Sequence, residues 1–425
     1  MLPLKFIRQN PEAVRRGMQS KGAEEERLDQ LLDLDAQVLK KNSRVESLKA
    51  RRNQASQEIA RLKQAGEAAK GEIAAMGDLS RQIKALDQEI HQLQEQLHQH
   101  LLWIPNLPHP SAPVGSDPSH NRVVCTVGEA VRPAFEARNH LDLLTLLGLV
   151  DFEAGARIAG RGFPLYTGRG ARLERALINF MLDLHTRERG YTEIYPPFMA
   201  TRQTTLMTGQ LPKLEDDMYI TTIDDLFLIP TAEVPVTGIH QDQIIPEDEL
   251  PRKYTAFSAC FRREAGSYGK ETRGLLRVHQ FNKVELVKLV HPATSYDELE
   301  TLRADAEEAL RRLGLAYRVV ELCTGDLSFA AAKCYDLEVY APAADQWLEV
   351  SSCSNFEAFQ ARRGNIRFRR KDTGKLDHVH TLNGSGVATP RLLVALLETC
   401  QRPDGSVTLP EALVPYYGEE QLTLP

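Results

Sequence analysis

The sequence has few cysteines and no long apolar run. Its six cysteines are scattered over 425 residues without a Cys-x-x-Cys pair, which argues against a disulfide-stapled scaffold and against a zinc site. No segment approaches the roughly 20 apolar residues that a membrane-spanning helix needs. Pro, Lys and Arg interrupt the first 17 residues, which is untypical of a signal peptide. We therefore expect a cytoplasmic protein with reduced thiols and no membrane contact.

An overall excess of positive charge is also missing. The formal net charge is −6, so any binding of nucleic acid must come from a local basic patch. Hydrophobic residues make up 42% of the chain and charged residues 26%, a globular balance that excludes a disordered or collagen-like chain. The length predicts two or three domains with a large buried core.

Residues 28–101 contain no proline and carry a heptad pattern of apolar residues. The downstream half repeats at alternating spacings of four and three, and the upstream half follows the same rhythm from Leu31 to Leu62. Glycines near residues 65–77 separate the two halves. The pattern predicts an antiparallel helical hairpin with a coiled-coil interface, which we expect to project as an arm. We assign residues 1–103 to this N-terminal domain.

The upstream half of the hairpin is locally basic. Between residues 40 and 63 the only acidic residues are Glu46 and Glu58, and phosphate backbones attract such segments. On charge alone a solvated coiled-coil surface is the simpler interpretation, because Lys and Arg are common there. The candidate nucleic-acid-binding residues in this stretch are Lys40, Lys41, Arg44, Lys49, Arg51 and Arg52.

A proline-rich stretch follows the hairpin, with five of the 23 prolines between residues 105 and 119. We interpret residues 104–130 as a linker. Residues 131–425 alternate short β-like runs with few helices, mainly at 171–190, 296–313 and 390–401. Many neighbouring strands with few crossover helices predict an α+β domain on a mostly antiparallel sheet flanked by helices, rather than a doubly wound fold.

Dense polar clusters interrupt the strand-like segments of this domain. Buried Arg and Glu are rare without partners, so Arg262 and Glu285 should line a cavity. Arg262 offers a fork of donors suited to phosphate, and Phe281 a flat face for a base. The segments 231–233 and 383–385 offer small hydroxyls, an amide and a carboxylate. Each cluster alone is more simply a salt bridge, turn or cap, but together they suggest a nucleoside triphosphate beside a small polar amino acid.

The segment Glu349-Val-Ser-Ser352 adds a candidate metal site. In a regular strand Glu349 and Ser351 share one face because they are two residues apart, and Ser352 at the strand end could turn toward the same metal. Carboxylate and hydroxyl oxygens suit Mg²⁺, which usually keeps substrate phosphates among its ligands. Arg391, at the start of the expected helix 390–401, supplies a second cation.

These clusters match a known pattern. Over its whole length the chain resembles the bacterial-type seryl-tRNA synthetases, which form a family of class II aminoacyl-tRNA synthetases. Their three class II motifs correspond to residues 190–197, 260–281 and 383–391, and the family's Thr-Ala-Glu and Glu-Val-Ser-Ser segments are residues 231–233 and 349–352. Two departures are Thr389-Pro390 before Arg391, where the family more often has a small or apolar residue and Gly, and Arg263, where many members have a small polar residue.

The resemblance implies a role for each matching residue. It implies ATP binding by Arg262, Arg263, Glu264, Val278, Phe281, Glu349, Val350, Ser351, Ser352 and Arg391. It implies serine binding by Thr231, Ala232, Glu233, Arg262, Glu285, Asn383 and Ser385. Glu349 and Ser352 would hold Mg²⁺, and the catalytic residues would be Arg262, Glu349 and Arg391.

The resemblance also implies an activity and partners. The enzyme would use ATP to activate L-serine to seryl-adenylate and would transfer the seryl group to tRNA(Ser), and to tRNA(Sec) where that tRNA exists. It would be a homodimer in which the arm of one subunit holds a tRNA whose acceptor end enters the other subunit. Two alternatives stay open: a class II homologue that loads an amino acid onto a carrier protein, and a non-catalytic coiled-coil interaction protein.

Overall fold

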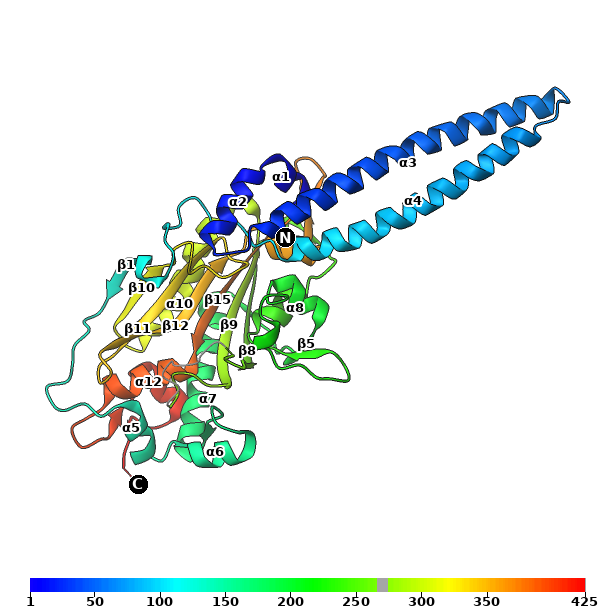
Figure 1. Ribbon diagram of the computed structural model, residues 1–425. Coiled ribbons are helices and arrows are strands. Elements are labelled where there is room, and N and C mark those ends of the chain that lie inside the picture. The colour runs from blue at the N-terminus through cyan, green and yellow to red at the C-terminus, as the bar shows by residue number, and fades with distance from the viewer. Residues whose placement is uncertain (266–273, 425) are drawn as a thin grey trace. The chain divides into compact units, whose positions relative to one another are not determined.

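The structure is a computed structural model that describes residues 1–265 and 274–424. It forms two compact units, Met1–Pro105 and Asn106–Pro425, which Figure 1 shows as ribbons. Residues 266–273 belong to the middle of the predicted second class II motif and lie outside the described residues.

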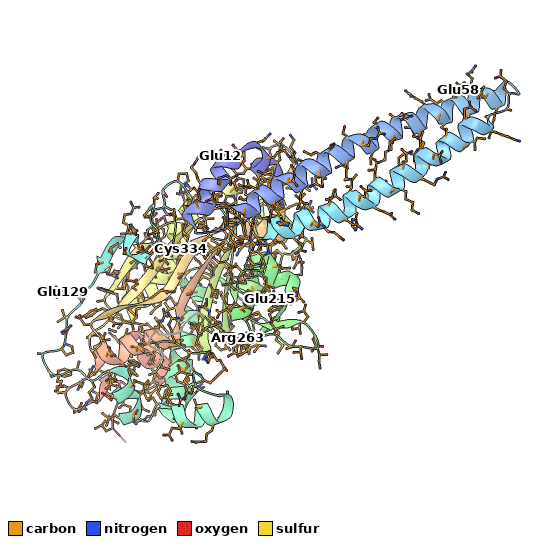
Figure 2. All side chains as sticks on the ribbon, in the orientation of Figure 1. Glu12, Glu58, Glu129, Glu215, Arg263 and Cys334 are labelled. Atoms are coloured by element: carbon orange, nitrogen blue, oxygen red, sulfur yellow. The ribbon has the colours of Figure 1, made fainter. Side chains whose placement is uncertain are left out.

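The first unit consists of helices. These are α1 (Leu4–Gln9), α2 (Pro11–Ser20), α3 (Glu26–Gln64) and α4 (Lys70–Leu102). Helices α3 and α4 lie side by side (Figure 1) and bury a seam of Val45, Leu48, Ile83 and Ile90 between them. This confirms the helical hairpin, and Glu58 marks the region near its far end (Figure 2).

The break between the two helices is shorter than we expected from the glycines. Only residues 65–69 are non-helical, and Gly71 and Gly77 lie within α4. Each glycine costs about 1 kcal/mol relative to alanine in a helix interior. The helix forms through them because the packing of its apolar seam, rather than propensity, supplies most of its stability.

An ion pair between an exposed arginine and a buried carboxylate fixes the base of the hairpin. Asp35 interrupts the apolar seam of α3 and is 3% exposed. Its two carboxylate oxygens accept hydrogen bonds from Arg8 Nε and Nη2 at 2.6 and 2.7 Å. Because a paired charge can be buried where a lone one cannot, this contact holds α1 against α3.

The second unit contains both helices and strands. Its helices are α5 (His140–Leu146), α6 (Phe152–Ala159), α7 (Gly168–Asp183), α8 (Arg202–Thr208), α9 (Glu233–Gly238), α10 (Ser295–Arg312), α11 (Phe359–Arg363), α12 (Thr389–Cys400) and α13 (Val414–Tyr417). Its strands are β1 (Arg122–Val127), β2 (Val150–Asp151), β3 (Leu165–Tyr166), β4 (Thr192–Glu193), β5 (Met199–Thr201), β6 (Leu226–Leu228), β7 (Ile244–Pro246), β8 (Arg252–Phe261), β9 (Gln280–Val290), β10 (Tyr317–Glu321), β11 (Lys333–Ala341), β12 (Gln346–Asn355), β13 (Arg367–Arg369), β14 (Leu376–His378), β15 (His380–Ala388), β16 (Val407–Thr408) and β17 (Gln421–Leu422).

Eight of these strands form one sheet in the order β1-β10-β11-β12-β15-β9-β8-β4. All neighbours are antiparallel except β4 and β8. Helices α7, α10 and α12 pack their apolar side chains on one face of the sheet (Figure 1) in the largest core cluster. The α+β domain on a mostly antiparallel sheet is therefore confirmed.

The start of the second unit is tied to the sheet. Asn106 donates from Nδ2 to the carbonyl oxygens of Ala330 and Phe356 at 3.0 and 2.9 Å, and β1 pairs with the edge strand β10. Among the residues that the structure describes, no helix has the length and apolarity to cross a membrane.

Candidate active site

A cavity of about 370 Å³ opens in the second unit, on the sheet face opposite α7 and α10. This volume falls in the range of small-ligand sites. Twelve of the predicted site residues line it: Thr231, Glu233, Arg262, Glu264, Val278, Phe281, Glu349, Val350, Ser352, Asn383, Ser385 and Arg391. The structure thus brings together segments that are 160 residues apart in the sequence.

The alternation of β9 explains which of its side chains face the cavity. Val284 and Leu286 belong to the core under the helices, so the odd-numbered positions point to the other face. Phe281 and Lys283 line the cavity, and Glu285 lies on the same face beneath them with no exposed surface.

Glu285 is the centre of a buried polar network. It accepts hydrogen bonds from Thr231 Oγ1 at 2.9 Å and from Asn383 Nδ2 at 2.5 Å. Lys283 Nζ lies 2.5 Å from its carboxylate and 3.0 Å from Thr231 Oγ1. Lys283 was not among the residues predicted for the site. Its signal was its odd position on the same strand, two residues before Glu285.

Glu233 brings a second carboxylate to this end of the cavity. It starts α9, where Thr231 Oγ1 accepts from its backbone N–H at 3.2 Å. Burial, and then repulsion from Glu285, raise its pKa to about 7, against the opposing effects of Gln360, Lys283 and Arg262. Its carboxyl group can therefore change charge near neutral pH.

The predicted alternation of Glu349 and Ser351 is wrong. Between Leu337 and Glu338 the register of β11 against β12 shifts by one residue, and this β-bulge leaves Val350 without a partner. Ser351 consequently turns into the sheet interior, where its Oγ donates to the Ser385 carbonyl at 2.6 Å. Ser352 instead shares the face of Glu349 and donates to its Oε1 at 3.2 Å. Since β12 continues to Asn355, Ser352 is not at the strand end.

Arg391 connects the start of α12 to this carboxylate. Its Nη1 donates to the Glu349 carbonyl at 3.0 Å and lies 3.3 Å from Oε2, and its Nε donates to the Leu276 carbonyl at 3.2 Å. The preceding Thr389-Pro390 does not disturb the helix. Pro390 occupies the first turn, where a missing N–H costs nothing.

Thr389 holds the start of the same helix through hydrogen bonds. Its hydroxyl donates to the buried carboxylate of Glu174 and also lies 3.1 Å from the Asn282 carbonyl. Asn282 Nδ2 donates to the same Glu174 oxygen at 2.9 Å. The residues that depart from the family pattern therefore make specific contacts of their own.

The segment after β8 separates its two arginines. The Arg262 guanidinium lies 5.3 Å from the Phe281 ring centroid, a cation–π distance, and both line the cavity. Glu264 accepts from Arg277 Nη1 at 2.8 Å. Arg263, labelled in Figure 2, does not line the cavity and donates instead to the Asp216 carbonyl at 2.9 Å.

Comparison with known proteins identifies the family. Residues 1–108 match the model of the seryl-tRNA synthetase N-terminal domain, and residues 215–400 match that of the tRNA synthetase class II core domain (G, H, P, S and T). The chain is 52% identical to the serine–tRNA ligase of Geobacter sulfurreducens over 98% of its own length and 99% of the relative's. It is 54% identical to that of Caldicellulosiruptor bescii, with 99% of both chains covered. The chain belongs to the seryl-tRNA synthetase family.

Solved structures of the family have the same fold. A crystal structure of seryl-tRNA synthetase from Pyrococcus horikoshii complexed with ATP superposes with a TM-score of 0.96 at 36% identity, covering all of both chains. A Giardia lamblia prolyl-tRNA synthetase in complex with prolyl-adenylate shares the fold alone. Its TM-score is 0.58 at 16% identity, over 67% of this chain and 57% of that one.

Four predicted residues of this seryl-tRNA synthetase family member stay outside the cavity lining: Ala232, Arg263, Glu285 and Ser351. Ala232 and Ser351 are buried beside lining residues, and Glu285 acts from beneath them. Gln360 is a residue that our sequence analysis missed, because no motif links it to Glu233, 127 positions away.

Proposed function

We propose that this chain is a serine–tRNA ligase that activates L-serine with ATP and transfers the seryl group to the 3′ end of tRNA(Ser). The relatives that cover its full length carry that name, and one solved relative was crystallised with ATP. The observation that carries the proposal is one cavity lined by Arg262, Phe281 and Arg391 together with Thr231 and Glu233, with the Glu285 carboxylate hydrogen-bonded to Thr231 beneath it.

ATP would occupy the side of the cavity that holds the arginines. Phe281 would offer its ring to the adenine, and Val278, Val350 and Glu264, which also line the cavity, would surround the nucleotide. Arg262 and Arg391 would stabilise charge on the phosphates. A serine carboxylate is already a competent nucleophile at neutral pH, so its attack on the α-phosphate needs no general base, only alignment and charge stabilisation.

Serine would occupy the opposite side. Thr231 and Glu233 would hold the α-ammonium group, and Glu285, Asn383 and Ser385 would surround the hydroxyl. A buried site that hydrogen-bonds a substrate hydroxyl rejects an analogue without it by about 10⁴-fold, because its own polar groups are left unpaired. Alanine would be excluded in this way.

Glu349 and Ser352 fit a Mg²⁺ ion. The bulge in β12 puts a carboxylate and a hydroxyl oxygen on one cavity face, and hard oxygen donors with room for substrate phosphates are what Mg²⁺ prefers. When bound, the ion would neutralise phosphate charge. Arg391, which contacts Glu349, would supply a further positive charge for the phosphates.

The hairpin arm would bind the tRNA. The six predicted basic residues are not equivalent in the structure. Lys41 pairs with Glu89 at 2.5 Å and Lys49 with Glu46 at 3.6 Å. Lys40, Arg44 and Arg51 are exposed and form no ion pair with the described residues. At 100° per residue these three lie within about 40° of one another on α3, a stripe suited to a phosphate backbone.

The proposal also covers the oligomeric state and the cellular location of the protein. The protein would act as a homodimer through residues 190–197, where the Tyr195 side chain is 77% exposed. A tRNA held by the arm of one subunit would enter the cavity of the other. We also propose a cytoplasmic location, and charging of tRNA(Sec) where that tRNA exists.

A carrier-protein ligase is less well supported as the function of this chain, because such homologues lack the arm. A non-catalytic protein would not need to retain the whole cavity.

Serine-dependent ATP–pyrophosphate exchange tests the first half-reaction. We expect exchange with serine alone among the twenty amino acids, and its loss in Arg262→Ala and in Glu349→Ala with unchanged thermal melting. Near-normal exchange in either variant would refute the role of that residue. Exchange that depends on another amino acid would refute the assignment of serine as the substrate.

Charging of tRNA(Ser) tests the arm. The triple substitution of Lys40, Arg44 and Arg51 by Gln should leave exchange intact and lower the kcat/KM for tRNA. It should also reduce the slope of log affinity against log salt by about 2–3, the loss expected for three phosphate contacts. The matched control removes three ion-paired charges, Lys41, Lys49 and Arg61. Equal losses in both triples would show that the stripe has no special role.

A further inference from the structure

Gln360 links the short helix α11 to the serine end of the cavity. Its side chain is buried, with 1% of the residue exposed. Its Nε2 donates to Glu233 Oε1 at 2.5 Å and to the Thr208 carbonyl at 3.0 Å. Its Oε1 accepts from Thr381 Oγ1 at 2.6 Å. Both ends of the amide are therefore occupied.

These contacts allow only one orientation of the amide. Rotating it by 180° would place its oxygen against the Glu233 carboxylate and the Thr208 carbonyl, both of which are acceptors. From the β15 side, the hydroxyl of Thr381 donates to the amide oxygen in the orientation that these acceptors select. A second residue of the same helix, Arg363, donates to the carbonyls of Leu206 and Leu211 at 2.8 and 3.1 Å. Helix α11 is thus anchored against the end of α8, which lines the cavity.

We infer that Gln360 is a positioning residue for the amino acid substrate, which keeps the Glu233 carboxylate ionised and fixed for the α-ammonium group of serine. The inference rests on the proposed function and assigns a task to a residue outside the three class II motifs. A charge-assisted hydrogen bond is about twice as strong as a neutral one, and here its donor is held on both sides.

The charges around Glu233 explain why it needs this support. Glu285 on β9 opposes its ionisation, whereas Lys283 on β9 and Arg262 after β8 favour it, as does the N–H of Gln360 on α11. Burial outweighs the favourable partners, so the pKa of Glu233 is about 7. Removing the Gln360 donor raises that pKa further, and a protonated carboxyl group no longer offers a negative charge to an ammonium ion.

Serine-dependent exchange of Gln360→Met, measured from pH 6 to pH 9, tests this inference. We expect the KM for serine to rise about tenfold or more at pH 7, while the KM for ATP and kcat at saturating serine stay within about threefold of wild type. The acid limb of kcat/KM for serine, which reports the free enzyme, should move to higher pH. A purely structural role would not move that limb.

Two further variants control for folding. Gln401 is a matched control, since it is also buried and its side chain makes three hydrogen bonds, to Arg138 and Glu398 far from the cavity. Gln401→Met should cost similar stability without changing the KM for serine. Thr381→Val keeps the Gln360 amide but removes the hydroxyl that donates to its oxygen, so the amide is held less firmly and the same parameters should shift in the same direction by less. If Gln360→Met does not fold, the same measurements on Thr381→Val test the inference instead.

The outcomes separate this inference from the proposed function. If the wild-type protein shows no exchange with serine, the proposed function fails. If wild type is active and Gln360→Met, or Thr381→Val in its place, keeps the wild-type KM and pH profile, this inference alone is overturned. An equal rise in the KM for ATP and for serine would also overturn it.

Discussion

Replacing Glu233 by glutamine should stabilise the substrate-free protein at alkaline pH. The carboxyl group has a pKa of about 7 in the fold, raised mainly by burial, against an ordinary value of 4.5. Because the folded pKa is the higher one, folding is most favoured below pH 4.5, and this contribution is lost as the pH rises through 7. At about 1.36 kcal/mol for each pH unit, the loss amounts to about 3 kcal/mol at pH 8. Glutamine has no charge to bury and keeps an oxygen for the Gln360 donor.

Urea unfolding of both proteins without substrates, at pH 5, 6, 7 and 8, measures this effect. The advantage of Glu233→Gln in free energy of unfolding should grow by about 2–3 kcal/mol between pH 5 and pH 8, mostly below pH 7, while its serine-dependent exchange is lost. Glu129→Gln, a change at an exposed carboxyl group labelled in Figure 2, is the control and should show no such growth. A constant difference across the pH range, or a less stable variant at pH 8, would refute the reasoning.

Three further predictions follow from local contacts. Ser352→Ala should weaken Mn²⁺ binding in the presence of a non-hydrolysable ATP analogue about tenfold by electron paramagnetic resonance, whereas Ser351→Ala should not; equal effects would contradict the β-bulge assignment. Thr389→Val should lower the free energy of unfolding by about 1–3 kcal/mol in urea titrations, because it leaves buried acceptors unsatisfied; an unchanged value would show that these hydrogen bonds contribute nothing. Gly71→Ala and Gly77→Ala should each stabilise the hairpin by up to about 1 kcal/mol in circular-dichroism melts, because a Cβ at either site meets open space; a lower melting temperature would contradict their placement inside α4.

The helical arm and the strands could be predicted from the sequence because the patterns that indicate them involve residues close together in the chain. A heptad repeat has one structural solution, a helix with one apolar seam, so the hairpin followed from residues 28–101. Short β-like runs with few crossover helices likewise predicted the mostly antiparallel sheet. The resemblance to a known family supplied the roles that no periodicity could provide.

The tertiary structure decided what depends on the registration of one strand against another. The sequence Glu349-Val-Ser-Ser352 does not indicate a bulge at Val350, because the bulge results from how β11 pairs with β12. That shift alone moves Ser351 into the core and Ser352 onto the cavity face.

By itself the sequence determined the two-part organisation, the helical arm and the list of segments from which the cavity is built. Only the fold decided which of their side chains meet. The hydrogen bond between Gln360 and Glu233 joins residues 127 positions apart, and Arg263 is turned away from the cavity that its neighbour Arg262 lines. The physical reason is that backbone patterns act over a few residues, whereas the partner of a buried polar group is set by whatever chain segment the packing brings within about 3 Å.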